Sequence, residues 1–258
     1  MVRTSILDHG LVLMSMPHKL AKALRVLASL DRHWMRALRL GVAPSLEHRR
    51  VLQQIAPASV VDIGANRGQF ALVSRHCYPD ARIVSFEPLP QPAAIFRQVF
   101  AGDARVLLHP YAIADKAGTA QMHVSARDDS SSLLSIAAEQ ERIFPGTAEV
   151  ALARIEMRRL ADVLQRADIA APALLKLDVQ GYELQALHGC ESLLDAFAWV
   201  YCECSFVELY AGQALADEVI AWLHERGLRL IGAYNMACDR EGRAIQADFL
   251  FARHGLGA

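Results

Sequence analysis

Acidic residues that follow short apolar runs are the side chains of this sequence best suited to bind a ligand. The first run ends at Asp62, and a turn of small residues leads from it into an apolar pattern with helical spacing. Gly64 would let the backbone turn sharply, and Gly68 would let helix and strand pack closely while backbone amides face the ligand. The carboxylate of Asp62 would repel a pyrophosphate but favour a ligand with an ammonium group, such as S-adenosylmethionine. The residues of this segment predicted to bind that ligand are Asp62, Gly64, Ala65, Asn66 and Gly68.

A second acid stands where the ribose of a nucleotide would be bound. Glu87 follows an apolar, β-branched segment at residues 81–86 and lies 25 residues after Asp62. A doubly wound sheet places an acid at this point, on the ribose hydroxyls. The order strand, glycine turn, helix, strand and acid therefore predicts a nucleotide-binding α/β domain. The other residues predicted to line the cofactor are Phe86, Pro88, Ala112 and Ile113, the last two at the adenine edge.

A third apolar run carries charges in its interior. Residues 173–179 include Lys176 and Asp178, and burying these charges is unfavourable unless they are paired or open to a cleft. Because ligands bind beyond the carboxyl ends of the strands, we expect Asp178 to stand beside Asp62 and Glu87. A structural ion pair, or a helix cap that also uses Glu183, is the alternative.

The elements that must position these residues alternate between strand and helix, as in a doubly wound, mostly parallel α/β sheet. At 258 residues the chain suits one large domain, at residues 57–258, preceded by an N-terminal helical extension at residues 1–56. The remaining expected elements are amphipathic helices within 17–40, a short helix at 45–55, a hairpin strand at 119–125, a strand at 198–204 ending near Glu203, and a C-terminal antiparallel pair at 228–233 and 247–252 joined by 235–243. The polar segment 128–134 is either a lid or substrate loop, or a plain surface connection.

Composition limits the partners and the compartment. The net charge of −1 gives no field for nucleic acid, and no apolar run is long enough for a transmembrane helix. The five cysteines lack Cys-x-x-Cys spacing, so we expect a reduced, cytoplasmic protein. The basic helices of the N-terminal region leave peripheral contact with a membrane open, although packing on the domain is the simpler interpretation.

Three segments together match a family pattern: DIGANRGQF at 62–70, FEP at 86–88 and LLKLDVQGYELQALHG at 174–189, supported by residues 112–115 and Glu203. On these segments the chain resembles the FkbM-type family of S-adenosylmethionine-dependent methyltransferases. The resemblance implies a class I methyltransferase fold and O-methylation of a sugar, glycolipid or polyketide-like metabolite. Two positions depart from the family. Ala161 interrupts a Leu-Asp-Asp pattern, and Gln180 stands where many members carry glutamate.

Methyl transfer to a hydroxyl requires alignment of oxygen, methyl and sulfur and removal of the hydroxyl proton. The predicted catalytic residues are Asp178 as base or substrate-orienting group, Lys176 as its charge partner and Glu203 as a second acid. His109 and His188 are further candidate bases, although a lone histidine is more often structural. Convergence of Asp178, Glu183 and Glu203 on a magnesium ion is conceivable, but nothing in their spacing requires a metal.

Three other functions compete with this interpretation. A nicotinamide-dependent oxidoreductase would need Gly-x-Gly-x-x-Gly, which the turn does not supply. A methyltransferase acting on RNA or protein, and a catalytically silent cofactor-binding scaffold, stay open. The identity of the small-molecule or glycan acceptor and the oligomeric state have no readable signal in the sequence.

Overall fold

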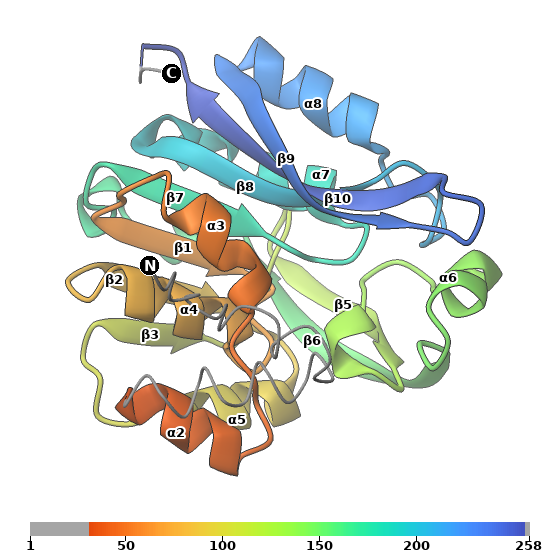
Figure 1. Ribbon diagram of the computed structural model, residues 1–258, viewed down its shortest axis with the longest axis horizontal. Helices are drawn as coiled ribbons and strands as arrows, with labels where there is room; N and C mark the ends of the chain where they lie inside the picture. Colours follow the sequence, from red (N-terminus) through yellow and green to blue (C-terminus); the bar gives the residue numbers. More distant parts are fainter. Residues whose placement is uncertain (1–30, 256–258) are drawn as a thin grey trace, which may run out of the picture.

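The computed structural model describes residues 31–255, which are organised around a seven-stranded sheet (Figure 1). Its strands are β1 (Ser59–Ile63), β2 (Arg82–Phe86), β3 (Val106–His109), β7 (Ala173–Leu177), β8 (Phe197–Ser205), β9 (Leu228–Cys238) and β10 (Ala244–Arg253). They lie in the order β3-β2-β1-β7-β8-β10-β9. The first five are parallel, whereas β10 runs antiparallel to both β8 and β9. The predicted doubly wound sheet with an antiparallel C-terminal pair is confirmed.

Helices cover both faces of this sheet. One face is covered by α2 (Arg32–Arg39), α3 (Arg49–Leu52), α4 (Gln69–Cys77), α5 (Pro90–Val99) and the short turn η2 (Leu46–His48). The other face is covered by α7 (Glu183–Cys190), α8 (Ala216–Glu225) and the turns η4 (Leu160–Asp162), η5 (Arg166–Asp168) and η6 (Glu191–Ala196). All residues of β1 and β7 are buried, which is why both read as continuous apolar runs rather than as alternating patterns.

A smaller, three-stranded sheet lies beside the carboxyl ends of the parallel strands (Figure 1). It contains β4 (Ala112–Ile113), β5 (Gly118–Ser125) and β6 (Glu149–Arg158) in the order β4-β6-β5. The hairpin predicted across the turn at 116–118 is wrong, because β6 lies between β4 and β5 and pairs with both. The segment between β5 and β6 forms η3 (Asp128–Ser130) and α6 (Ala138–Ile143).

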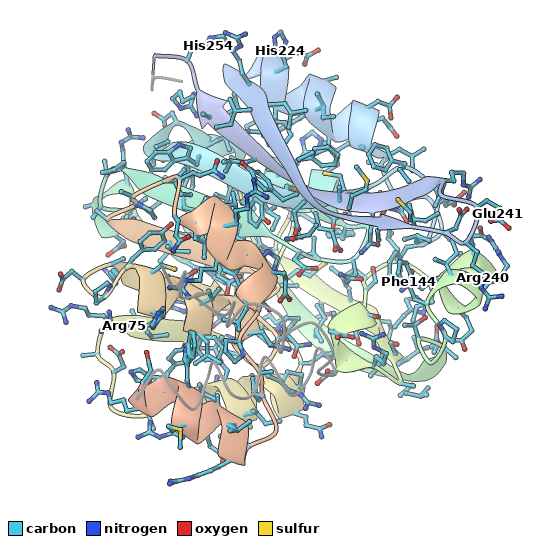
Figure 2. All side chains as sticks on the ribbon, viewed as in Figure 1. Arg75, Phe144, His224, Arg240, Glu241 and His254 are labelled. Atoms are coloured by element: carbon cyan, nitrogen blue, oxygen red, sulfur yellow. The ribbon has the colours of Figure 1, made fainter. Side chains whose placement is uncertain are left out.

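Local differences from the expected elements have simple causes. The strand β9 continues to Cys238, so the connection to β10 is a tighter turn than the expected 235–243 loop. This turn contacts α6, since Arg243 Nη2 lies 3.8 Å from Glu139 Oε1, and Figure 2 shows the nearby Arg240, Glu241 and Phe144. In residues 31–255, no helix is long and apolar enough to cross a membrane.

The N-terminal part that is described packs on the domain. The indole of Trp34 in α2 is buried and donates to the carbonyl of Leu72 at 3.2 Å. Arg36 donates to the carbonyls of Val99 and Ala101, at 3.2 and 2.6 Å. The expected basic residues before residue 31 lie outside the described residues, and the domain boundary at residue 56 stays a prediction.

The glycine turn after β1 is fixed by close backbone contact. Gly64 has φ +79°, and a Cβ atom there would lie 1.8 Å from the carbonyl oxygen of Asp178. The amides of Gly64 and Ala65 both donate to the carbonyl of Phe86, at 3.1 and 3.0 Å. A side chain at position 64 would therefore push apart the ends of β1 and β7.

Gly64→Ala is expected to lower the free energy of unfolding by at least about 2 kcal/mol, from the left-handed φ and the clash together. Gly102→Ala is the matched control, because Gly102 also has positive φ (+80°) but has no atom within 4 Å of the added Cβ. Urea unfolding measures both. Equal losses in the two variants would show that the approach of Asp178 is unimportant.

Candidate active site

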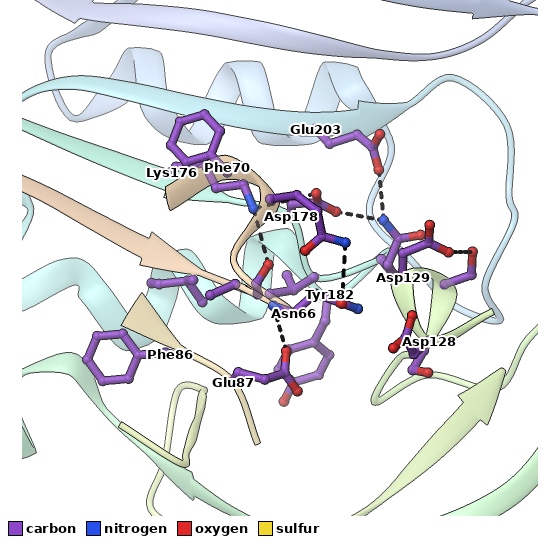
Figure 3. Close-up of a pocket in the computed structure, with 18 of the residues that line it drawn as sticks. Asn66, Phe70, Phe86, Glu87, Asp128, Asp129, Lys176, Asp178, Tyr182 and Glu203 are labelled. Carbon is purple, nitrogen blue, oxygen red and sulfur yellow. Dashed lines mark hydrogen bonds and ion pairs between the residues drawn. The ribbon is translucent and has the colours of Figure 1, made fainter. Parts of the chain in front are cut away.

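A pocket opens at the carboxyl ends of β1, β2, β7 and β8, closed on one side by η3 and its flanking residues (Figure 3). Most of the residues predicted to act in binding or catalysis line it. They are Gly64, Ala65, Asn66, Phe86, Glu87, Pro88, Ala112, Ile113, Lys176, Asp178 and Glu203. Residues from four strands and three strand-end turns are thus brought to one cavity.

Glu87 is held at the end of β2 by two backbone hydrogen bonds. Its Oε2 accepts from the amide of Asn66 at 2.9 Å, and its Oε1 accepts from the amide of Leu89 at 2.7 Å (Figure 3). Burial raises the pKa of Glu87 to about 7, although both amides act to lower it. The carboxyl is fixed in direction and retains lone pairs for a diol, as ribose recognition requires.

Asp62 does not lie where the sequence suggested. Its side chain is fully buried, is absent from the pocket lining, and pairs with Lys176 Nζ at 3.2 Å. Asp62 and Lys176 are register partners on adjacent strands, so both side chains leave the same face of the sheet. Asp62 thus has an internal ammonium partner, and its direct contact with a ligand ammonium group stays a prediction from the sequence.

Lys176 links Asp62 to the pocket. Its Nζ also lies 3.5 Å from Asp178 Oδ2 and donates to the carbonyl of Gly64 at 3.2 Å. Burial alone would lower the pKa of Lys176, but the carboxylates of Asp62 and Asp178 outweigh it and raise the pKa above its ordinary value. The predicted charge partnership of Lys176 and Asp178 is present, and the ammonium stays charged.

Gly68 is also outside the pocket lining. It has φ +92° at the start of α4, and an added Cβ would meet the rings of Phe96 and Phe100 at 3.0 and 2.7 Å. The close packing expected at this glycine is therefore made with α5 rather than with β1. Its direct contact with a cofactor stays a prediction without geometric support.

Gln180 bridges Asp178 and Glu203 on the other side of the pocket. Its Nε2 donates to Asp178 Oδ1 at 2.6 Å and to Glu203 Oε2 at 3.0 Å, while its Oε1 accepts from the Tyr210 hydroxyl at 2.8 Å. Burial, followed by the charges of Asp178 and Asp248, raises the pKa of Glu203 well above its ordinary value. An amide at position 180 supplies the donors that two neighbouring carboxyls need.

Glu183 is turned away from these acids. Its Oε1 accepts from the amides of Val179 and Gly181, both at 3.1 Å, so it fixes the turn before α7. The three acids considered as magnesium ligands thus do not converge. Within residues 31–255, no group of three or more His, Cys, Asp or Glu side chains is arranged to hold a metal ion.

The segment 128–134 forms a wall of the pocket. Asp128 accepts from Arg67 Nε at 2.6 Å, and Ser132 Oγ donates to the carbonyl of Gln180 at 2.7 Å. Three serines of this segment, Ser130, Ser131 and Ser132, are buried. The segment is therefore anchored to both the glycine turn and the turn after β7.

Several lining residues were not among the predicted site residues. They include His48, Phe70, Tyr182, Asn235, Gln246 and Asp248. Phe70 and Tyr182 lie within the family segments but were given no role, and Asp248 carried a hint as an acid inside an otherwise apolar strand. The positions of His48, Asn235 and Gln246 over the pocket depend on tertiary packing.

Lys176→Met is expected to lower the free energy of unfolding by about 3–5 kcal/mol, because Asp62 would be left buried without its counter-ion. Adding Asp62→Asn should restore a large part of this loss. A double-mutant cycle by urea unfolding tests the coupling. Additive effects of the two substitutions would contradict it.

Stability should also fall as pH rises, because burial raises the pKa of Glu183 to about 7 from 4.5. This carboxyl favours the folded state when protonated, so its contribution is complete below its unfolded pKa and is lost through about pH 7. In Glu183→Gln the decline in Tm between about pH 5 and 8 should be shallower. An unchanged decline would exclude Glu183 as a source. Glu225→Gln is the control, because the Glu225 side chain at the end of α8 is exposed.

Comparisons with known proteins agree with this geometry. Residues 62–230 match the family described as the methyltransferase FkbM domain. The 2-O-methyltransferase NoeI of Sinorhizobium fredii is 29% identical over 174 residues, covering 64% of this chain and 72% of the relative. The 31-O-demethyl-FK506 methyltransferase FkbM of Streptomyces tacrolimicus is 27% identical over 206 residues, covering 69% and 75%.

The chain is also similar to solved structures of methyltransferases. A Burkholderia thailandensis 1,6-didemethyltoxoflavin-N1-methyltransferase, with bound 1,6-didemethyltoxoflavin and S-adenosylhomocysteine, is 13% identical with a TM-score of 0.41, covering 93% of this chain and 91% of that one.

Because the family match spans more than half of the sequence, the chain belongs to the FkbM family of S-adenosylmethionine-dependent methyltransferases.

Proposed function

We propose that this methyltransferase methylates a hydroxyl group of a small metabolite, sugar, glycolipid or polyketide. Two relatives are named as a 2-O-methyltransferase and a 31-O-demethyl-FK506 methyltransferase, and both names place the methyl group on oxygen. The pocket supports such an acceptor because its far side is dense in hydrogen-bonding groups. Asp178, Gln180, Glu203 and Gln246 line it together.

The donor would occupy the side of the pocket formed by the glycine turn and Glu87. S-adenosylmethionine supplies a methyl group on a positively charged sulfur. The carboxyl of Glu87 would hold the ribose hydroxyls, and Ala112 and Ile113 would lie at the adenine edge. The acids around the pocket would favour the positive charge of the donor.

Asp178 would orient the acceptor rather than remove its proton. Both oxygens of its carboxylate are engaged, one near Lys176 Nζ at 3.5 Å and one by Gln180 Nε2 at 2.6 Å. A carboxylate held in this way has a fixed direction and can still accept a hydrogen bond from a hydroxyl. Glu203, whose raised pKa favours the protonated form, would act beside it as a hydrogen-bond donor.

The observation that carries this proposal is the continuity of the pocket from Glu87 to Asp178 and Glu203. A donor-binding acid and an acceptor-side cluster share one cavity, as group transfer requires. A scaffold that only binds the cofactor would need no second polar cluster. A methyltransferase acting on RNA or protein is less favoured, since the net charge of −1 provides no field for a polyanion.

Calorimetric titration of the whole chain with S-adenosylhomocysteine tests the donor site. Saturable binding is expected, and NADH should not bind. Glu87→Gln should weaken binding by about 10- to 100-fold, the effect of losing a hydrogen bond to a charged group. The exposed variant Glu225→Gln should bind like the wild type. A folded wild type that binds no S-adenosylhomocysteine would contradict the proposal.

A further inference from the structure

A histidine and a carboxylate from distant parts of the chain meet at the acceptor side of the pocket. His48 comes from η2, before the first strand, and Asp248 lies on β10. The His48 Nδ1 atom is 3.4 Å from Asp248 Oδ2, and both residues line the pocket. Of the histidines in residues 31–255, His48 is the one that lines it.

The polar groups around His48 gather at one ring nitrogen. Nδ1 lies 3.0 Å from the Tyr201 hydroxyl and 3.3 Å from Asn235 Nδ2, which itself donates to Asp248 Oδ2 at 2.7 Å. With its proton on Nδ1, His48 donates toward Tyr201 and Asp248. No hydrogen bond to Nε2 is made by any of the residues that the structure describes. The basic nitrogen of this tautomer is therefore left for a ligand.

The ring itself is held in place. It packs edge-on against Phe70 and Tyr201, with centroid distances of 5.3 and 5.6 Å. Phe70 in turn lies under Lys176, whose Nζ is 5.4 Å from the ring centre. Asp248 and Glu203 are register partners on adjacent antiparallel strands. His48 thus lies next to the acid cluster and across the pocket from Glu87.

We propose that His48 is the general base that takes the proton from the acceptor hydroxyl, with Asp248 as the positioning residue that stabilises its protonated form. This inference rests on the proposed O-methyltransferase function. The acceptor oxygen forms its bond to the methyl carbon as the carbon–sulfur bond breaks, and that bonding pair stays on sulfur, which becomes neutral. The hydroxyl proton passes to Nε2 of His48 and is later released to water.

The charged groups around the His48 imidazole favour its gain of the hydroxyl proton. Asp248 on β10 and Tyr201 on β8 contact the ring, and Asp62 on β1 interacts with it electrostatically. Glu203 on β8 and Lys176 on β7 line the same pocket, with Lys176 as the opposing cation. Burial would raise the pKa of Asp248, but hydrogen bonds from His48, Asn235 and Tyr201 outweigh it and lower the pKa. Asp248 therefore stays ionised and can stabilise an imidazolium beside it.

The other described histidines near the domain core are placed differently. His109 stacks on Phe86 at 5.2 Å between ring centres, and His188 packs on Trp222 at 5.2 Å, under the opposite face of the sheet. His123 forms a comparable pair with Glu149, with Nδ1 2.6 Å from Oε2, but neither residue lines the pocket. This second pair is a matched control.

The first test needs no acceptor. NMR of the histidine ring nitrogens in the whole chain, saturated with S-adenosylhomocysteine, should show that Asp248→Asn shifts the Nδ1 resonance of His48. Glu149→Gln should shift the Nδ1 resonance of His123 and leave that of His48 unchanged. Identical His48 ring resonances in the wild type and in Asp248→Asn would overturn the proposed pair.

The second test measures transfer from S-adenosylmethionine to a panel of methyl glycosides and to 31-O-demethyl-FK506 across pH. His48→Gln should lower kcat by at least about 100-fold while affinity for S-adenosylhomocysteine stays within about two-fold. Because the base must be neutral, wild-type kcat should rise with pH, and Asp248→Asn should move this rise to lower pH. His123→Gln should behave as the wild type.

The outcomes separate the two proposals. Full kcat in His48→Gln would overturn the assignment of the base and leave the O-methyltransferase function standing. A wild type that binds neither S-adenosylhomocysteine nor S-adenosylmethionine would defeat the proposed function itself. A fall in kcat without any change in the pH profile of Asp248→Asn would overturn the positioning role of Asp248.

Discussion

The ion pair between Lys176 and Asp62 is the interaction on which the pocket depends. Both side chains are buried in the middle of the sheet, and the 3.2 Å contact is what makes their burial tolerable. The same ammonium group contacts the carbonyl of Gly64 and the carboxylate of Asp178. One buried cation therefore fixes the glycine turn, the end of β7 and the first acid of the acceptor side relative to each other.

The sheet order then determines which acids share the cavity. Because β1 lies between β2 and β7, Glu87 and Asp178 approach the glycine turn from opposite sides. Because β8 and β10 follow β7, Glu203 and Asp248 extend the row of acids. The carboxylates of this row would repel one another if all of them were ionised. Gln180, Lys176 and the raised pKa of Glu203 reduce this repulsion and keep the region negative enough for a cationic donor.

The sequence predicted the features that depend on local order along the chain. The glycine turn, the acid after the second strand and the charged third run each follow from a pattern within a few residues, and the parallel order of the sheet follows from their alternation. Asp62 was misplaced because its neighbour across the sheet, Lys176, is set by strand register rather than by any motif. The carboxylate that seemed to face a ligand forms an ion pair within the protein.

Other features needed the tertiary structure. His48 lies in a short turn with no motif, and its partners Tyr201 and Asp248 belong to strands near the other end of the chain. The position of Gly68 against α5 depends on helix packing, and the three-stranded sheet depends on the pairing of β6 with both β4 and β5. Local motifs and hydrophobic periodicity carry no signal for such long-range pairings.

A crystal structure of the protein soaked with S-adenosylhomocysteine would test the central claim most directly. The ribose hydroxyls are expected to lie within hydrogen-bond distance of the Glu87 carboxyl, and the sulfur is expected to face the side of the pocket formed by Asp178, Glu203 and His48. Asp62 should keep its contact with Lys176 and make none with the ligand. Density for the ligand away from Glu87, or a sulfur that points away from these acids, would contradict this claim.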